Sequence, residues 1–334
     1  MAKVLIANDI HIIDGIYNEI TLQWFDKVFE YITKNEIKYF IIAGDLFEKA
    51  SRIKNEVFLP LFFRLMRFHS AGIKMWFVLG NHDIYNNDND SLVEAFAPFG
   101  EVVKNYKQIV IDGETIDLLA YTKEEEDIPD TNNILITHLA IADFQFDNKY
   151  NANEKMAFPR NLFKKFKLVI TGHFHKYQHK GNIVYGGSPF QLGFEEMGCE
   201  KGFLVLDTKT ITVEFVKNLF SPTYMEIDLD KITSIDDFSE LDVKNKFVGV
   251  IMREKVDNFI KLKHVLYEKG ALDITPKYEN EKNDILTSDE KPVEFNKNVD
   301  DMFLEFIKNN IKLEGIDNNR LVDIFEEIKE EIEA

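Results

Sequence analysis

Short apolar runs recur along the first 220 or so residues, and each of the strongest ones ends at a polar turn. Runs rich in Val, Ile, Leu and Phe without polar alternation are typical of strands that are buried on both faces. Five such strands are predicted at residues 3–7, 39–43, 75–79, 133–137 and 168–172.

Helical patterns separate the first three of these strands. Residues 19–34 place Leu22, Phe25, Phe29 and Ile32 on one face, and residues 55–69 are apolar nearly all round. Strand and helix in alternation indicate parallel pairing with right-handed crossovers. Residues 108–121 instead predict a β-hairpin that turns at the pair Asp112-Gly113. The expected fold class is therefore α/β, a sandwich of two sheets flanked by helices.

The pattern changes after residue 220, which predicts the domain organisation. Residues 1–220 form the first domain. Residues 221–280 read as strand, strand, helix and strand, a small α+β domain. Residues 281–297 are polar and poorly periodic, so we interpret them as a linker. Residues 298–334 predict a pair of amphipathic helices.

Composition narrows the function classes. The net charge of −18 argues against a protein that grips nucleic acid by bulk charge alone. The single cysteine, Cys199, allows no intrachain disulfide, which fits a reducing cytoplasm. No apolar run approaches the roughly 18 to 20 residues that span a bilayer, and the start lacks a secretory cleavage site. We expect a cytoplasmic protein without membrane association.

Polar residues of a restricted set follow every one of the five buried strands. In an open α/β sheet, ligand sites form beyond the carboxyl ends of the strands. Five of the eight histidines lie there. In chain order the set is Asp9 and His11, Asp45, Asn81 with His82 and Asp83, His138, and finally His173 and His175.

This set of side chains suits a pair of divalent metal ions. Imidazole nitrogen with carboxylate and amide oxygen favours Zn, Mn or Fe. Two ions need a bridging carboxylate, for which Asp45 is the natural candidate, and they can activate water to attack a phosphoryl group. His82 lies near the ions without being needed as a ligand, and Asp83 could hold its tautomer. Any one of these residues alone would read as structural, but their joint recurrence after strands favours a site.

The series Asp-x-His, Gly-Asp, Gly-Asn-His-Asp, His and Gly-His-x-His resembles that of the calcineurin-like metallophosphoesterases. The resemblance covers residues 9–175 and implies two divalent metal ions, manganese being expected and magnesium the alternative. It implies that one metal is held by Asp9, His11, Asp45 and His175, and the other by Asp45, Asn81, His138 and His173. It also implies that His82, the catalytic residue next to Asp83, contacts the scissile phosphate or protonates the leaving group.

Further motifs resemble the nuclease branch of this family. Residues 43–50 are similar to its Gly-Asp-Leu-Phe-Asp motif, with Glu48 in place of the last Asp, and residues 184–203 to its Tyr-x-Gly-Ser, Phe-x-Glu and Lys-Gly stretch. Together with the domain layout they resemble the nuclease subunits of SbcCD-type repair complexes, in the shorter phage recombination version. The resemblance implies a metal-dependent DNA exonuclease or endonuclease, a small capping domain that positions DNA, and a coiled-coil ABC-type ATPase as partner in double-strand-break repair and recombination.

Several residues are candidates for contacts with DNA or protein partners. DNA contacts are predicted for Lys176, His179, Lys180 and Ser188, which otherwise read as a solvated loop and a tight turn. The apolar excess of residues 55–69 makes a homodimer seam plausible beside a purely internal role. The terminal helices carry two apolar stripes for ATPase binding, one with Met302, Phe303, Phe306 and Ile307, the other with Leu321, Phe325 and Ile328. Folding back onto the chain's own core is the alternative.

Two other functions compete with the nuclease. A phosphatase or small-molecule phosphodiesterase would use the same metal residues, but would leave the capping domain, linker and terminal helices to be explained. A non-enzymatic subunit that only organises an assembly is disfavoured by the completeness of the metal set.

Overall fold

The computed structural model describes residues 2–13, 15–49, 53–86, 88–145, 157–232, 240–253 and 259–278. The chain divides into two compact units, Met1–Glu279 and Asn280–Ala334. The linker and the two terminal helices expected at 281–334, with the ATPase-binding residues assigned to them, lie outside the described residues.

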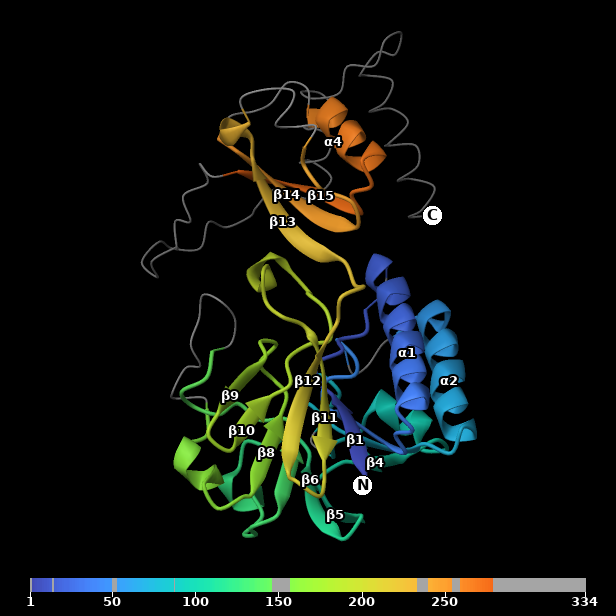
Figure 1. Ribbon diagram of the computed structural model, residues 1–334, viewed down its shortest axis with the longest axis vertical. Coiled ribbons are helices and arrows are strands. Elements are labelled where there is room, and N and C mark those ends of the chain that lie inside the picture. The colour runs from blue at the N-terminus through green and yellow to red at the C-terminus, as the bar shows by residue number, and fades with distance from the viewer. Residues whose placement is uncertain are drawn as a thin grey trace, which may run out of the picture. The chain divides into compact units, whose positions relative to one another are not determined.

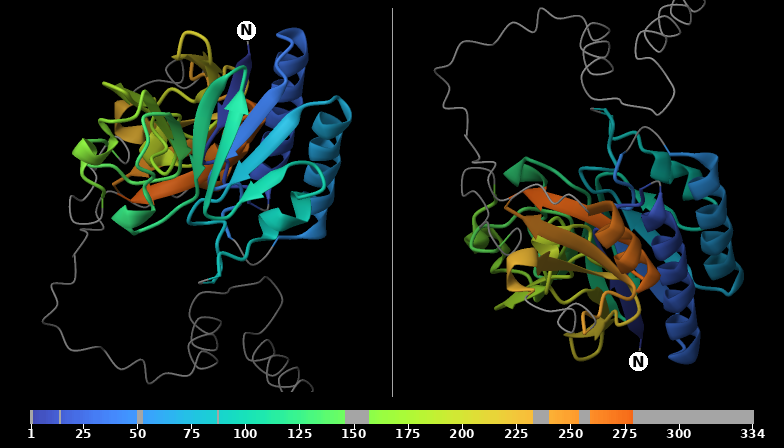
Figure 2. Two further views of the ribbon diagram at one scale, coloured as in Figure 1. Left: turned by 90° about the horizontal axis from the view of Figure 1, so that it is seen from below. Right: turned by 90° about the horizontal axis from the view of Figure 1, so that it is seen from above.

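The first of two six-stranded sheets is built around the N-terminal strand. Four strands run parallel, and a pair of strands from later in the chain, antiparallel to each other, extends the sheet at one edge. In spatial order the strands are β12 (Thr212–Lys217), β11 (Gly202–Asp207), β1 (Lys3–Ala7), β2 (Tyr39–Ala43), β3 (Lys74–Val78) and β4 (Glu101–Val103). The helices α1 (Ile16–Lys34) and α2 (Asn55–Ser70) lie side by side along this sheet (Figures 1 and 2).

The second sheet also mixes both strand directions. Its four central strands are parallel, and one antiparallel strand forms each edge. In spatial order it contains β5 (Tyr106–Ile111), β6 (Glu114–Leu119), β7 (Ile134–Thr137), β8 (Leu168–Thr171), β10 (Ile183–Tyr185) and β9 (Gln178–Lys180). The predicted hairpin is confirmed as β5–β6, with Asp112 and Gly113 at φ 53° and 86°, as its tight turn requires.

The two sheets share one hydrophobic core, which explains the apolar runs. Ile6 of β1, Ile136 of β7 and Ile170 of β8 are fully buried in the same cluster. On the outer side of the first sheet, Trp24 and Phe25 of α1 and Phe68 of α2 join that cluster. A strand that is covered on both faces has no polar side, which accounts for the uninterrupted apolar runs. The five predicted strands and the α/β sandwich of two sheets are confirmed.

A third, three-stranded parallel sheet follows the two larger ones. It comprises β13 (Thr223–Asp228), β14 (Lys246–Met252) and β15 (Asp273–Tyr278), with α4 (Phe259–Glu268) between the last two strands. The strand, strand, helix, strand order expected for 221–280 is confirmed for the described residues of this range. Phe247 stacks on Tyr17 of α1 at 5.2 Å between ring centroids, and the backbone N–H of Tyr224 donates to Gln191 at 2.7 Å.

Short 3₁₀ turns complete the described part of the chain. They are Leu92–Phe96, Glu125–Asp127, Arg160–Phe163, Phe194–Glu196 and Leu229–Lys231. Within the described ranges, no helix is both long and apolar enough to cross a membrane.

Candidate metal centre

Loops from both large sheets bring the polar strand-end residues together. Asp9 and His11 follow β1, Asp45 follows β2, His138 follows β7, and His175 follows β8. Three groups of potential ligand atoms form there, each within 4.8 Å: Asp9 with His11 and His175, Asp9 with Asp45 and His138, and His11 with Glu48 and His82. Residues more than 160 positions apart thus share one buried site.

Asp45 lies at the centre of this arrangement. Its Oδ2 atom is 3.0 Å from Nε2 of His138 and 3.5 Å from Nε2 of His11. Its Oδ1 atom accepts the backbone N–H of His82 at 2.9 Å. A carboxylate that faces histidines from both predicted ligand sets is placed as a bridging ligand would be.

Two buried atoms of the centre, Oδ2 of Asp9 and Nε2 of His11, have no hydrogen-bond partner in the structure. Buried polar atoms are nearly always satisfied, so two neighbouring exceptions need an explanation. Carboxylate oxygens and imidazole nitrogens that face one another suit hard or borderline divalent cations. The residues present therefore fit a pair of divalent metal ions.

The Nδ1 atom of each of three histidines in the site lies within hydrogen-bond distance of an oxygen atom. Nδ1 of His11 lies 2.7 Å from Oε2 of Glu48, Nδ1 of His175 lies 2.7 Å from Oε1 of Glu196, and Nδ1 of His138 lies 3.1 Å from the carbonyl oxygen of Ala43. Metal-binding histidines usually donate their second N–H to a carboxylate or a carbonyl, which fixes the tautomer and the ring orientation. These three histidines have that arrangement.

The side chains of His173 and Asn81 contact each other in the same site. Nδ1 of His173 is 2.8 Å from Oδ1 of Asn81, and the backbone N–H of His173 donates to Oδ1 of Asp9 at 2.8 Å. The structure thus brings together all seven residues expected to bind metal.

The pKa values of two histidines in the site shift in opposite directions. Burial works against the charged form of His138, but the carboxylate of Asp45 outweighs it and raises the pKa of that imidazole to about 9. Burial and the neighbouring charge of His138 lower the pKa of His173 to about 4. The carboxylates beside His138 therefore favour a positive charge at this position, where a bound metal ion would compete with protons.

The backbone around the centre is strained. Asp9, His11, Asp45 and His173 all have positive φ, at 50°, 47°, 53° and 86°. Such conformations are uncommon for residues other than glycine and cluster at functional sites. Glycines permit the close packing beneath: a Cβ on Gly80 would lie 2.1 Å from Oδ1 of Asp45.

The expectation that Asp83 orients the ring of His82 is wrong. The buried Asp83 carboxylate instead accepts backbone N–H groups of Gly80 and Phe47, both at 3.0 Å, and of Leu46 at 3.3 Å. It ties the loop after β3 to the loop after β2. Burial, and then the charge of Asp45, raise its pKa to about 6. His82 is oriented by the carbonyl oxygen of Glu48, 2.9 Å from its Nδ1.

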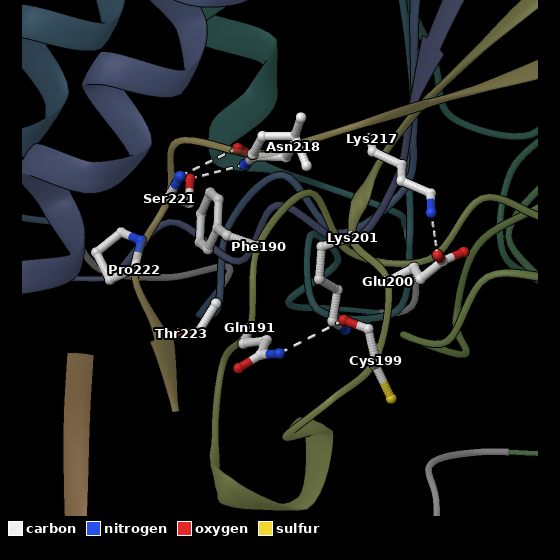
Figure 3. Close-up of a pocket in the computed structure, with 11 residues that line it drawn as sticks. Phe190, Gln191, Cys199, Glu200, Lys201, Lys217, Asn218, Ser221, Pro222 and Thr223 are labelled. Atoms are coloured by element: carbon white, nitrogen blue, oxygen red, sulfur yellow. Dashed lines mark hydrogen bonds and ion pairs between the residues drawn. The ribbon is translucent and has the colours of Figure 1, made fainter. Parts of the chain in front are cut away.

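Glu48, Glu196 and Lys201 were not identified as site residues from the sequence. Glu48 also lies 4.0 Å from Nδ1 of His82, so its carboxylate serves two histidines. Lys201 is buried, pairs with Glu196 at 2.8 Å and donates to the carbonyl oxygen of His175 at 2.7 Å. The Phe-x-Glu and Lys-Gly motifs were the available signal. Lys201 also borders a pocket of about 220 Å³, beside Phe190, Cys199 and Asn218 (Figure 3).

The four candidate DNA-contact residues fall into different environments. Lys176 donates to Oε1 of Gln145 at 2.7 Å, and Lys180 donates to the carbonyl oxygen of Asp143. His179 is exposed on β9. Ser188 is fully buried, with its Oγ 2.6 Å from Nζ of Lys201, so the expectation that it meets DNA is wrong. The tight turn that carries Ser188 folds inward to complete the Lys201 network.

A known protein family matches the part of the chain that carries the candidate metal centre. The family model for calcineurin-like phosphoesterases matches residues 2–177, more than half of the chain. Exonuclease subunit 1 of Enterobacteria phage T4 is 26% identical over 211 residues, which are 60% of this chain. The match spans 61% of the length of that relative.

Matches among solved structures include three phosphoesterases at low identity. An archaeal phosphodiesterase is 14% identical, with a TM-score of 0.37 over 65% of this chain and 99% of its own. The phosphoesterase Yfce from E. coli is 16% identical, with a TM-score of 0.34 over 65% and 98%. A dimetal phosphatase from Danio rerio is 10% identical, with a TM-score of 0.40 over 61% and 91%.

Proposed function

The chain belongs to the calcineurin-like phosphoesterase family, and we propose that it is a two-metal DNA nuclease that hydrolyses phosphodiester bonds at DNA ends. The observation that carries this proposal is the position of Asp45 between His138 and His11, one histidine from each proposed ligand set, at 3.0 Å and 3.5 Å. A centre of this kind suits phosphoryl transfer because the substrate brings negative charge to a site that holds positive charge.

We assign one metal to Asp9, His11, Asp45 and His175, and the other to Asp45, Asn81, His138 and His173. Manganese is the expected ion and magnesium the alternative. When bound, the pair supplies Lewis-acid activation of water and neutralises charge on the phosphoryl oxygens. Glu48 and Glu196 hold the rings of His11 and His175 in the orientation that binding needs, through contacts of 2.7 Å each.

His82 is the residue that handles the leaving group in this mechanism. A carbonyl oxygen only accepts hydrogen bonds, so Nδ1 of His82 donates to Glu48 and carries a proton. That leaves Nε2 as the ring nitrogen available to the substrate. The side chain is 39% exposed, so it can reach a bound substrate. We assign to Nε2 the contact with the scissile phosphate or the protonation of the departing oxygen. Asp83 acts one step removed, by holding the loop that carries His82.

DNA is the favoured substrate for two reasons. The T4 relative is named an exonuclease subunit. The third sheet, packed on α1 through Phe247 and Tyr17, gives the chain a second element beside the phosphoesterase core. We assign it, as the domain of residues 221–280, the positioning of duplex DNA. Lys176, His179 and Lys180 are the proposed contacts from the first domain, on the side of β9.

Two kinds of protein partner are proposed. The apolar stripes predicted within residues 298–334, joined through the linker 281–297, are assigned to a coiled-coil ABC-type ATPase, with which the nuclease would act in double-strand-break repair and recombination. We assign to the outer face of α2 the binding of a second copy of the chain. There Leu59, Phe63 and Met66 are 49%, 57% and 39% exposed and lie at helical spacing on one stripe.

A paired assay tests the nuclease against its alternatives. Purified full chain with manganese is given an end-labelled duplex in one reaction and a chromogenic phosphate ester in another. The nuclease predicts cleavage of the duplex. Hydrolysis of the ester with an intact duplex would favour a small-molecule phosphodiesterase or phosphatase. Tight metal binding without either activity would favour a subunit that only organises an assembly.

A further inference from the structure

A pocket of about 530 Å³ opens beside the metal centre. Its lining comes from the loop after β3, the connection between β4 and β5, and the segment that follows β6. Among the lining residues are Asn81, Ile84, Asn89, Asn105, Tyr106 and Tyr121. A pocket of this size is in the range that holds small organic ligands.

The pocket is continuous with the candidate metal centre. Asn81 belongs to both, since its Oδ1 atom lies 2.8 Å from Nδ1 of His173. The ring of Tyr121 stacks against the ring of His173, with centroids 6.1 Å apart and planes 23° from parallel. A group seated on Tyr121 would therefore lie next to the residues that would face a scissile phosphate.

Tyr121 is held in place by main-chain contacts between the two large sheets. Its backbone N–H donates to the carbonyl oxygen of Leu79 at 2.8 Å, and that of Ala120 donates to Asn105 at 2.7 Å. Tyr106, across the lining, is anchored by a 2.9 Å hydrogen bond from its hydroxyl to Asp117. Aromatic rings fixed in this way can bind a flat ligand without first paying to order themselves.

The charge of the lining selects against a phosphate. Lys123 is the one cation among the lining residues, and Glu124 and Asp127 outnumber it. Amide side chains of Asn89 and Asn105, themselves joined at 2.8 Å, supply neutral polar groups instead. Aromatic, apolar and amide groups with a slight negative balance suit an uncharged planar heterocycle rather than a sugar-phosphate backbone.

We propose that this pocket binds one nucleobase, stacked on Tyr121, of the nucleotide adjacent to the phosphodiester that is cut. The proposal rests on the proposed nuclease function for the adjacency to the cut bond, but the recognition of a base rests on the pocket alone. Base–aromatic stacking tolerates every sequence, because each base has a π-face. The pocket thus positions a strand end without reading its sequence.

Binding of a phosphate-free nucleoside tests the pocket directly. Metal-free full chain is titrated with deoxyadenosine and, separately, with deoxyribose, by saturation-transfer NMR. The wild type and Tyr121→Phe should bind deoxyadenosine through its base protons and show no comparable signal with deoxyribose. Tyr121→Leu should weaken binding by about 5- to 150-fold, the usual worth of one base–aromatic stack. Ile84→Trp, which fills the pocket from another loop, should do the same.

Tyr39→Leu provides the matched control. Tyr39 begins β2, at the end of the strand opposite to Asp45, and stacks on Trp76 with centroids 6.2 Å apart. It should leave deoxyadenosine binding unchanged, and thermal melting checks that every variant is folded. Wild-type affinity for deoxyadenosine in both Tyr121→Leu and Ile84→Trp, or no binding by the wild type, would overturn the proposal.

A second assay separates failure of the pocket from failure of the nuclease. With manganese present, wild type should cleave a normal strand end with a lower KM than an end whose terminal residue is abasic, and Tyr121→Leu should lose that difference. Equal KM values for both substrates in the wild type would overturn the pocket and leave the nuclease standing. Base binding that depends on Tyr121, in a protein that cuts no DNA, would instead support a site for a free nucleotide and refute the nuclease.

Discussion

The imidazole of His175 and the carboxylate of Glu196 meet at 2.7 Å, although 21 positions separate them in the chain. Lys201 holds the other oxygen of the same carboxylate at 2.8 Å. Burial alone would raise the pKa of Glu196, but the hydrogen bond with His175 and the charge of Lys201 hold it at about 2. A permanently ionised carboxylate therefore orients one of the proposed metal ligands from behind.

Glu196→Ala should weaken metal binding because the ring of His175 loses its anchor. Loss of such outer partners typically costs about 10- to 100-fold in metal affinity. Manganese titration by calorimetry measures the effect. Glu195→Ala is the matched control, since Glu195 is the exposed neighbour on the same 3₁₀ turn. Wild-type affinity in a folded Glu196→Ala protein would show that His175 needs no such support.

His82→Ala and Asp45→Ala should fail in different ways. His82→Ala should retain two metals per chain while turnover falls by about 100- to 10,000-fold, the usual worth of a proton-transfer residue. Asp45→Ala should lose or scramble the metals, because Asp45 faces a histidine from each of the two proposed ligand sets. Elemental analysis alongside the cleavage assay distinguishes the two. A fully active His82→Ala enzyme would remove His82 from the mechanism.

Gly80→Ala should damage the centre without removing any of its charged groups. Its Cβ would lie 2.1 Å from Oδ1 and 2.4 Å from the backbone nitrogen of Asp45, so the loop after β2 must shift. Metal content and activity should both drop. Gly72→Ala is a demanding control: its φ of +76° makes alanine strained there, but nothing lies within 4 Å of the added carbon. Equal metal content in both variants would mean that the Asp45 loop is more yielding than this packing implies.

Phe63→Glu should convert a dimer into a monomer. The substitution places a charge in the middle of the stripe formed with Leu59 and Met66, where a second copy would have to bury it. Sedimentation velocity measures the mass in solution. Ile260→Glu, at an 85% exposed position on α4, controls for added charge. A wild-type chain that is monomeric at high concentration would contradict the assignment of this face.

Deletion of residues 298–334 should abolish binding of the ATPase partner and leave manganese-dependent nuclease activity nearly intact. The prediction depends on the apolar stripes in the sequence, with Phe303 and Phe306 in one and Phe325 in the other. The metal centre lies wholly within the unit Met1–Glu279. Co-purification with the ATPase is the readout. Undiminished retention of the truncated protein would move the docking surface to the first unit.

The strands and the metal set were predictable because each leaves a local mark. A strand buried on both faces must be apolar throughout, and a ligand at its carboxyl end follows it directly in the chain. Asp9, Asp45, Asn81, His138 and His173 could be found in this way. Partners that lie behind the ligands leave no such mark. Glu48 and Glu196 contact histidines 37 and 21 positions away, and no periodicity encodes that distance.

The two wrong assignments have a shared physical cause. Asp83 follows His82 directly in the chain and Ser188 lies in a glycine-containing turn, so the sequence predicted that both side chains face the site or its substrate. Both side chains turn inward and satisfy buried groups: Ser188 bonds Lys201, and Asp83 bonds three backbone N–H groups. Burial of the surrounding loops decides their direction, and the sequence records it only indirectly.

The most direct test of the central claim, that the strand-end residues form one two-metal centre, is an anomalous difference map from a crystal of the manganese-soaked protein. Two peaks are expected in each chain, about 3.5 to 4 Å apart as in other two-metal sites. One should contact His11 and His175, the other His138 and His173, and the carboxylate of Asp45 should lie between them. A single peak, or manganese bound away from Asp45, would contradict the account.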